Sequence, residues 1–218
     1  DMTWALLMNV TRRIGEGDRM IRNDAWVGWG PLQLLGGDIT GATLGLIGLG
    51  RIGKAMIPRA KGFSMKVIYW NRTRLDPVEE DALGVEYATK DKVLQEADFI
   101  SLHVALFPET RHLIAERELS LMKPTAYLIN TTRGPVVDEK ALVAALQENQ
   151  IAGAGLDVYE QEPKVEPGLL PLENVVLAPH LGSATIGTRT KMGMMVAGNI
   201  EAFLKGESPP NVVNPQVS

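Results

Sequence analysis

Residues 43–53 read TLGLIGLGRIG, a short apolar run that leads directly into the spacing Gly48-x-Gly50-x-x-Gly53. Between a strand and a helix, the first glycine of this spacing makes the tight turn and the second lets the backbone approach a pyrophosphate. The third lets the helix pack closely on the strand. A second apolar run at 66–70 follows at the distance that a strand–helix–strand unit requires. The pattern therefore favours a dinucleotide site over a simple packing turn.

Short apolar runs and helical patterns alternate along most of the chain. The predicted strands cover 43–47, 66–70, 85–88, 98–102, 126–130, 153–158 and 175–178, and the clearest intervening helices cover 51–60, 91–97, 115–122 and 138–148. Continuous apolar strands separated by helices are typical of a parallel sheet that is covered on both faces. We therefore predict an α/β fold, a Rossmann-type doubly wound parallel sheet, with ligands outside the carboxyl ends of its strands.

Segments outside this alternation are also distinctive. Apolar residues at helical spacing predict a helix over 2–14, ahead of the first strand. A Gly/Pro-rich loop with Trp26 and Trp29 follows it. At the other end, a helix of about 185–205 leads into a proline-rich tail.

Bulk properties exclude several classes of protein. The 218 residues are 45% hydrophobic and 22% charged, as in an ordinary globular protein. A net charge of -4 gives no electrostatic reason to expect nucleic acid or an anionic membrane as a partner. The chain has no cysteine and no apolar stretch of membrane-spanning length. We expect a cytoplasmic protein with no metal site.

The residues after the second strand bear on which dinucleotide is bound. NAD sites usually place a carboxylate there to accept hydrogen bonds from the ribose hydroxyls. This chain has Asn71, Arg72, Thr73 and Arg74 instead. Guanidinium groups bind a 2′-phosphate through charge-assisted hydrogen bonds, so NADP is the expected cofactor, with NAD possible. The alternative is that both arginines are ordinary solvated charges of a loop.

Polar side chains also follow three later strands. Arg133 comes after the fifth predicted strand and is suited to bidentate binding of a substrate carboxylate. Asp138 is placed to cap the next helix. Carboxylates follow the sixth strand at 157, 160 and 162, and His180 follows the last. An arginine that orients an acid, an imidazolium that donates a proton and a carboxylate beside it suffice for ketone reduction.

Four motifs together resemble the D-isomer-specific 2-hydroxyacid dehydrogenases, and within them the glyoxylate/hydroxypyruvate reductases. They are GLGRIG at 48–53, NTTRGPVVD at 130–138, GLDVYEQEP at 155–163 and PHLGSA at 179–184. The resemblance implies that Arg133 binds substrate, that His180 donates the proton and that Glu162 pairs with it. Glu160 is interpreted as structural.

The resemblance also assigns the dinucleotide contacts. Arg51 and Ile52 would lie over the pyrophosphate, while Asp157 and backbone near Thr131 would hold the nicotinamide carboxamide. Further contacts are expected from His103, Thr132 and Ser183. The chain has HVALF at 103–107 where the family usually has His-x-Pro-Leu-Thr, which affects the loop beside the adenosine.

Members of this family also have a substrate domain. The resemblance implies that residues 1–205 form the NAD(P)-binding domain, with an interdomain helix at 1–22 and a dimerisation-type loop at 23–40. The tail at 206–218 would return towards the substrate domain, which is absent here. We expect a homodimer, and we expect the 218-residue chain to bind NADP(H) but to turn over a small 2-oxo acid poorly.

Two other functions remain open at this point. The same fold and triad occur in corepressors that sense the dinucleotide and bind peptides, but a sensor of this kind would be expected to keep an acidic NAD signature after the second strand. The chain could also act on another 2-hydroxy acid, such as phosphoglycerate or lactate. The sequence does not separate these substrates.

Overall fold

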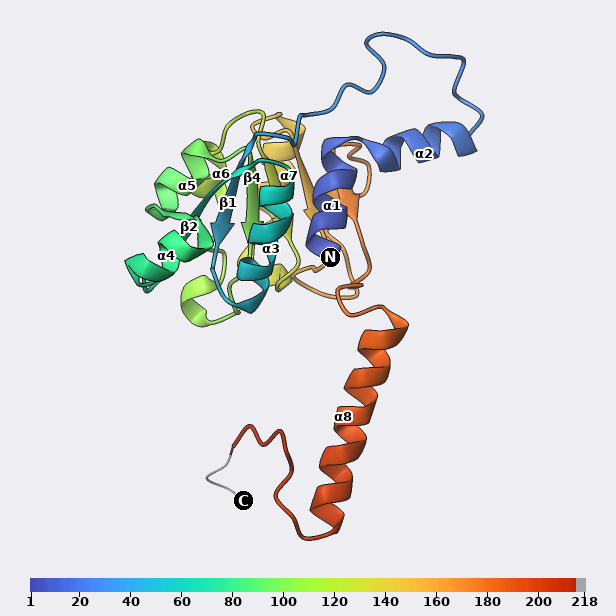
Figure 1. The fold of residues 1–218 in the computed structure, drawn as a ribbon. Helices are drawn as coiled ribbons and strands as arrows, with labels where there is room; N and C mark the ends of the chain where they lie inside the picture. Colours follow the sequence, from blue (N-terminus) through green and yellow to red (C-terminus); the bar gives the residue numbers. More distant parts are fainter. Residues whose placement is uncertain (215–218) are drawn as a thin grey trace. The chain divides into compact units, whose positions relative to one another are not determined.

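The computed structural model describes residues 1–214, and the chain forms two compact units, Asp1–His180 and Leu181–Ser218. The first unit is an α/β body and the second is built on one long helix (Figure 1). Each unit is described separately below.

Seven strands form one sheet, in which every paired neighbour is parallel. Its order is β3-β2-β1-β4-β5-β6-β7, so the strand sequence reverses between β1 and β4. This confirms the predicted doubly wound α/β fold and places its switch point beside the glycine-rich turn. The strands are β1 Thr43–Ile47, β2 Lys66–Trp70, β3 Glu86–Tyr87, β4 Phe99–Leu102, β5 Tyr127–Asn130, β6 Gly153–Leu156 and β7 Val175–Leu177.

Helices cover both faces of the sheet (Figure 1). The helices α5 Lys90–Glu96, α6 Glu116–Leu121 and α7 Glu139–Gln147 pack their apolar side chains into one core cluster. The other cluster joins α1 Met2–Thr11 and α3 Arg51–Gly62 to the opposite face. Strands that are buried on both sides in this way leave only their ends available for polar chemistry.

Three features of the elements differ from what the apolar pattern indicated. The single helix expected over 1–22 is two, because α1 ends at Thr11 and α2 spans Ile14–Arg22. Arg13 between them has a left-handed backbone with φ of 51°, and Asn9 accepts a hydrogen bond from the Gly15 N–H, so the chain turns there. The expected strand at 85–88 is reduced to two residues.

The third difference is a helix that the apolar pattern did not reveal, α4 Pro77–Leu83. Its ends carry ordinary helix signals. The Asp76 side chain accepts a hydrogen bond from the Val78 N–H, Pro77 is in the first turn, and Gly84 follows with φ of 61°. Capping residues, more than hydrophobic periodicity, therefore specify this short helix.

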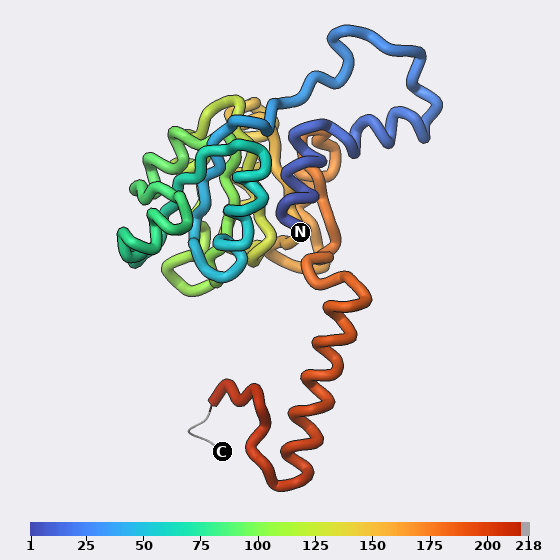
Figure 2. The backbone as a smooth tube through the Cα atoms, viewed as in Figure 1, coloured from blue at the N-terminus to red at the C-terminus, as the bar shows by residue number. Residues whose placement is uncertain are grey.

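The segment after α2 extends away from the body of the first unit (Figure 2). It presents large apolar side chains to solvent: Trp26, Val27, Trp29, Leu32 and Leu35. Trp29 is 83% exposed. A monomer seldom exposes this much contiguous apolar surface, so the segment has the properties of a contact surface.

The second unit contains α8 Ile186–Leu204. Thr185 caps its N-terminus, because the Thr185 hydroxyl accepts a hydrogen bond from the Thr188 N–H. Asn199 and Asn211 hydrogen-bond to each other and join this helix to the chain that follows it. Among the helices within residues 1–214, none is both long and apolar enough to span a membrane.

Glu80 on α4 anchors the residues that follow β2. Its carboxylate accepts hydrogen bonds from the Arg74 guanidinium at 2.9 and 2.7 Å and from the Tyr69 hydroxyl at 2.5 Å. The Arg74 bond first and the Tyr69 bond second lower the pKa of Glu80 to about 2. A lowered pKa contributes stability above the ordinary value of 4.5, and that contribution is lost as the pH falls towards 2.

We therefore expect Glu80→Gln to lower the melting temperature at pH 7 and to cost much less near pH 2. Thermal melts followed by circular dichroism measure this difference. Glu79→Gln is the matched control, because Glu79 pairs with Lys54 at the exposed surface, where an ion pair contributes little. A Glu80→Gln deficit that is the same at both pH values would contradict the assignment.

Candidate active site and dinucleotide site

The glycine-rich turn is shaped by close backbone contacts. Gly48 has φ of +97°, and a Cβ on it would lie 2.8 Å from the carbonyl carbon of His103, which follows β4. A Cβ on Gly53 would lie 2.5 Å from the Gly48 carbonyl oxygen. These two glycines therefore permit the tight turn and the close packing of α3 on β1.

Gly50 differs from its neighbours because a Cβ on it would meet no atom within 4 Å. It precedes α3, whose first turn has no side-chain hydrogen bond capping it. The open space and the uncapped amide groups suit a pyrophosphate at the positive end of the helix dipole. Arg51 is exposed beside them, and Ile52 is 62% exposed, so both can cover a bound pyrophosphate.

The segment after β2 divides into two halves with different partners. The Asn71 side-chain oxygen accepts a hydrogen bond from the Leu49 N–H at 2.7 Å, which fixes the glycine turn. Arg72 and Thr73 are exposed, and Arg72 makes no ion pair or hydrogen bond within residues 1–214. Arg72 is therefore the guanidinium that is available to a 2′-phosphate.

Arg74, expected to share that role, has other partners. It forms a two-point ion pair with Glu80, and its guanidinium carbon lies 5.1 Å from the centre of the Tyr87 ring. The hydrogen bonds to Glu80 raise the pKa of Arg74. The structure thus gives Arg74 a structural role next to the site, and its contact with a 2′-phosphate stays a prediction.

His103 lies at the switch point, against the glycine turn. Its Nε2 is 2.9 Å from the Ser101 hydroxyl, while its buried Nδ1 has no hydrogen-bond partner. Burial lowers the pKa of His103 to about 4, so the ring is neutral near pH 7. An unsatisfied nitrogen in this position is consistent with a ligand that completes its hydrogen bonds.

His180 and Glu162 meet beyond β7 and β6. His180 Nδ1 lies 2.8 Å from Glu162 Oε2, and the two side chains are 50% and 36% exposed. Because a carboxylate oxygen accepts, Nδ1 carries the hydrogen and Nε2 faces away from this bond. The other Glu162 oxygen accepts from the Tyr159 N–H at 3.1 Å, which fixes the carboxylate beside the ring.

Electrostatics also join Arg133 to this pair. Burial alone would raise the pKa of Glu162. The pKa is nevertheless lowered, because Glu162 accepts hydrogen bonds from His180 and the Tyr159 N–H and lies near the charges of His180 and Arg133. Arg133 itself is exposed, and its guanidinium donates to the Thr132 carbonyl at 2.6 Å. The three residues expected to act together therefore lie at one end of the sheet.

The remaining expected contacts are placed as follows. The Thr131 hydroxyl is 2.8 Å from the Thr3 hydroxyl of α1, and the Thr132 hydroxyl donates to Asn130. Asp157 is buried directly after β6. Ser183 belongs to the second unit, ahead of α8. Their contacts with a dinucleotide stay predictions, and so does the catalytic role of Arg133, Glu162 and His180.

Sequence reasoning missed one cluster. Glu160 was interpreted as structural and His112 was given no role, and in the structure His112 Nε2 lies 2.9 Å from Glu160 Oε2. Glu139 and Glu160 also bind each other's backbone N–H groups. Asp138 caps α7 as expected. These partners are far apart in the chain, and no local spacing could have joined them.

Comparison with known proteins gives the family. Residues 4–182 match the model of the D-isomer specific 2-hydroxyacid dehydrogenase NAD binding domain. The glyoxylate reductase of Thermococcus litoralis is 55% identical over 100% of this chain and 66% of its own length. That of Korarchaeum cryptofilum is 54% identical with the same coverage. The chain thus spans slightly less than two thirds of these curated relatives.

Solved structures agree. A glyoxylate reductase from Paecilomyes thermophila superimposes with a TM-score of 0.87 at 40% identity, covering 99% of this chain and 64% of that one. An NADPH-dependent glyoxylate/hydroxypyruvate reductase from Sinorhizobium meliloti, in complex with NADP and malonate, gives 0.85 at 38% identity, covering 94% and 63%. With its switch-point glycine turn and its paired histidine and glutamate, this chain belongs to the D-isomer specific 2-hydroxyacid dehydrogenase family.

Proposed function

We propose that this chain is the coenzyme-binding part of a reductase that transfers hydride from NADPH to a small 2-oxo acid. The acid is of the glyoxylate/hydroxypyruvate class, and the product is the D-2-hydroxy acid. The observation that carries the proposal is the 2.8 Å contact between His180 and Glu162 beside Arg133. In this proposal residues 1–205 form the NAD(P)-binding domain and 206–218 lead away from it.

The three side chains have separate tasks. The Arg133 guanidinium binds the substrate carboxylate and orients the ketone. When bound, NADPH would supply the hydride that the carbonyl carbon accepts. His180 donates the Nε2 proton to the carbonyl oxygen as negative charge develops there, and Glu162 stabilises the imidazolium before transfer. The proton and the hydride together account for the alcohol that forms.

Residues at the glycine turn would hold the dinucleotide. The α3 amide groups with Arg51 and Ile52 would bind and cover the pyrophosphate, and Arg72 would bind the 2′-phosphate. Near the nicotinamide, Asp157 and backbone at Thr131 would orient the carboxamide. The nicotinamide would then lie near the carboxyl ends of β5 and β6, and Arg133 is in the loop that follows β5.

Steady-state assays with a panel of 2-oxo acids, each with NADPH and with NADH, test the proposal. Glyoxylate and hydroxypyruvate should give the highest kcat/KM, and NADPH should be preferred. Pyruvate and phosphohydroxypyruvate are in the panel because the sequence left dehydrogenases of lactate and phosphoglycerate open. A preference for either of those acids would overturn the proposed substrate class.

Arg72→Ala tests the choice of cofactor. A charge-assisted contact contributes about 1.5–3 kcal/mol, so its loss should raise the Kd for NADPH roughly tenfold or more and leave that for NADH nearly unchanged. Calorimetric titration of the 218-residue chain measures both values. Arg74→Ala is the comparison, and we expect a smaller change because Glu80 already holds Arg74. Equal weakening of NADPH and NADH by Arg72→Ala would refute the 2′-phosphate role.

The exposed segment with Trp26 and Trp29 supports a second proposal, a twofold symmetric homodimer that buries it. A glutamate buried there would be left without a partner, so Trp29→Glu should dissociate the dimer. Sedimentation equilibrium of the wild type and the variant measures this. Val78→Glu is a control, because Val78 is equally exposed on α4, away from this segment. A wild-type chain that sediments as a monomer would contradict the proposal.

A further inference from the structure

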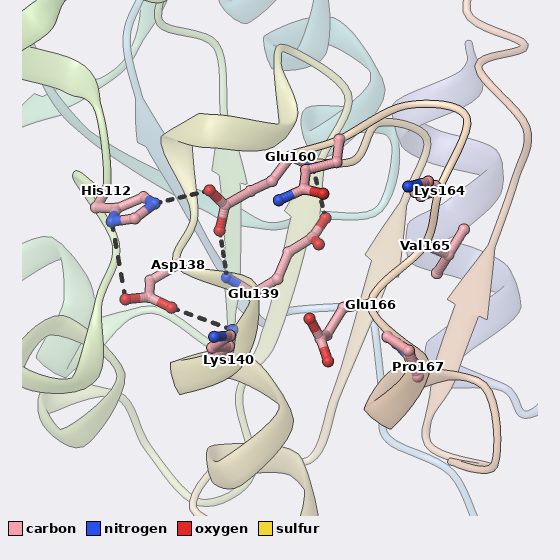
Figure 3. A pocket seen from close by; sticks show the side chains of 10 residues that line it. His112, Asp138, Glu139, Lys140, Glu160, Lys164, Val165, Glu166 and Pro167 are labelled. Atoms are coloured by element: carbon pink, nitrogen blue, oxygen red, sulfur yellow. Dashed lines mark hydrogen bonds and ion pairs between the residues drawn. The ribbon is translucent and has the colours of Figure 1, made fainter.

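The cluster around His112 lines a pocket of about 590 Å³ beside the start of α7 (Figure 3). Glu160 Oε1 accepts a hydrogen bond from the Glu139 N–H at 3.1 Å, and Glu139 Oε1 accepts one from the Glu160 N–H at 2.8 Å. We call this reciprocal pair the Glu139–Glu160 clamp. The second Glu160 oxygen meets His112 Nε2 at 2.9 Å and the Arg111 guanidinium at 3.4 Å.

The clamp is an unfavourable place for the Glu139 carboxylate. Glu139 is only 6% exposed, and its burial, with the neighbouring charges of Glu160, Glu166 and Glu162, raises its pKa. An amide side chain would accept the same N–H hydrogen bond without the repulsion. Within residues 1–214, no group of three or more His, Cys, Asp or Glu side chains is arranged to hold a metal ion.

The clamp is connected directly to the catalytic pair. Two consecutive amide groups are bound by two different glutamates: the Tyr159 N–H by Glu162 and the Glu160 N–H by Glu139. The Glu162 carboxylate thus binds a backbone segment whose next amide group is bound by Glu139. The charge of Glu162 also helps to raise the pKa of Glu139, so the two carboxylates are close enough to interact.

Two further contacts make this segment rigid. A Cβ on Gly134 would lie 1.8 Å from the Tyr159 carbonyl carbon, so the chain that precedes α7 packs directly against the segment. The Tyr159 hydroxyl donates to the Ala178 carbonyl at 2.9 Å, two residues before His180. The same short segment therefore contacts the acid and the backbone next to the imidazole.

We propose that Glu139, acting through the Glu139–Glu160 clamp and its His112 anchor, is a positioning residue that sets the Glu162 carboxylate against the His180 imidazole. This inference rests on the proposed function of Glu162 and His180 as the acid–base pair. Glu139 touches neither substrate nor cofactor. Its effect is on the strength of the Glu162–His180 contact. The charges of His180 and Arg133 also act on this pair, because both lower the pKa of Glu162.

The test is an NMR titration of the imidazole groups in the 218-residue chain. The chain has three histidines, so the His180 signal is assigned by its loss in His180→Gln. Glu162→Gln should move the midpoint of the His180 titration down by about one pH unit, since it removes the charge that stabilises the imidazolium. Glu139→Ala should move that midpoint in the same direction by roughly half as much. Glu139→Gln, which keeps the acceptor oxygen, should restore the wild-type midpoint.

Controls separate the possible outcomes. Lys140→Gln alters the next residue of the same pocket, is exposed, and should leave the midpoint unchanged. If Glu139→Ala does not fold, His112→Ala replaces it, because it frees one side of the Glu160 carboxylate at a half-exposed position. A midpoint that stays at the wild-type value in Glu139→Ala, or in His112→Ala, while it moves in Glu162→Gln, overturns the positioning role alone. No shift in Glu162→Gln overturns the acid–base pair, and the positioning role with it.

Discussion

Gly50→Glu should abolish dinucleotide binding without unfolding the protein. A Cβ on Gly50 would meet no atom within 4 Å, and its φ of -79° is accessible to any residue. A side chain there would fill the space in which the pyrophosphate approaches the α3 amide groups, and its negative charge would repel the phosphates. We expect the Kd for NADPH to rise about 100-fold or more, equivalent to roughly 2.7 kcal/mol, in calorimetric titrations.

The neighbouring glycines provide the contrast. Gly53→Val would drive its Cβ into the Gly48 carbonyl oxygen and should lower the melting temperature as well as binding. Gly62→Glu places the same charge in open space at the far end of α3 and should leave the Kd for NADPH nearly unchanged. Unaltered NADPH affinity in a folded Gly50→Glu chain would show that the pyrophosphate does not approach this turn.

His180→Gln should reduce kcat for 2-oxo acid reduction by about 10²–10⁴-fold, the usual contribution of a general acid. The glutamine amide is not acidic enough to transfer a proton to the carbonyl oxygen, although it can still donate a hydrogen bond to Glu162. The measurement is steady-state reduction of glyoxylate by NADPH. It requires a form of the protein with measurable wild-type activity. NADPH affinity should change little, because the 2.8 Å partner of His180 is Glu162 and not a residue of the glycine turn.

His112→Gln is the matched control, because it changes another histidine–glutamate pair at the same end of the sheet. Its glutamine can still donate to Glu160, so kcat should fall only slightly. A His180→Gln variant that keeps most of the wild-type kcat would show that the proton comes from another group, and the proposed mechanism would fail.

The sequence by itself determined the architecture. Strands that are buried on both faces must be apolar throughout, and a turn between strand and phosphate-binding helix must be glycine-rich, so both leave local patterns that can be read directly. The capping role of Asp138 was equally local. Helix α4 was missed because its specification lies in Asp76, Pro77 and Gly84 and not in an apolar period.

Part of the candidate site also followed from the sequence. Arg133, Glu162 and His180 each lie in the loop that follows a strand, and parallel strands bring their carboxyl ends to one edge. Among the three carboxylates after β6, the family resemblance selected Glu162 as the partner of His180, and the structure has this contact at 2.8 Å. The sequence did not show which of the two arginines after β2 has no partner. Arg74 pairs with Glu80, and Glu80 is on α4, the helix that the apolar pattern did not reveal.

Only the tertiary structure decided the environment of the remaining groups. Glu139 and Glu160 are 21 residues apart, and His112 is 48 residues from Glu160, yet their polar atoms lie within hydrogen-bonding distance. Burial likewise lowers the pKa of His103, although nothing in its local sequence marks it as buried. Local sequence fixes which residues end each strand, but desolvation and charge pairing depend on every segment that packs around them, so these properties emerge only when the chain is folded.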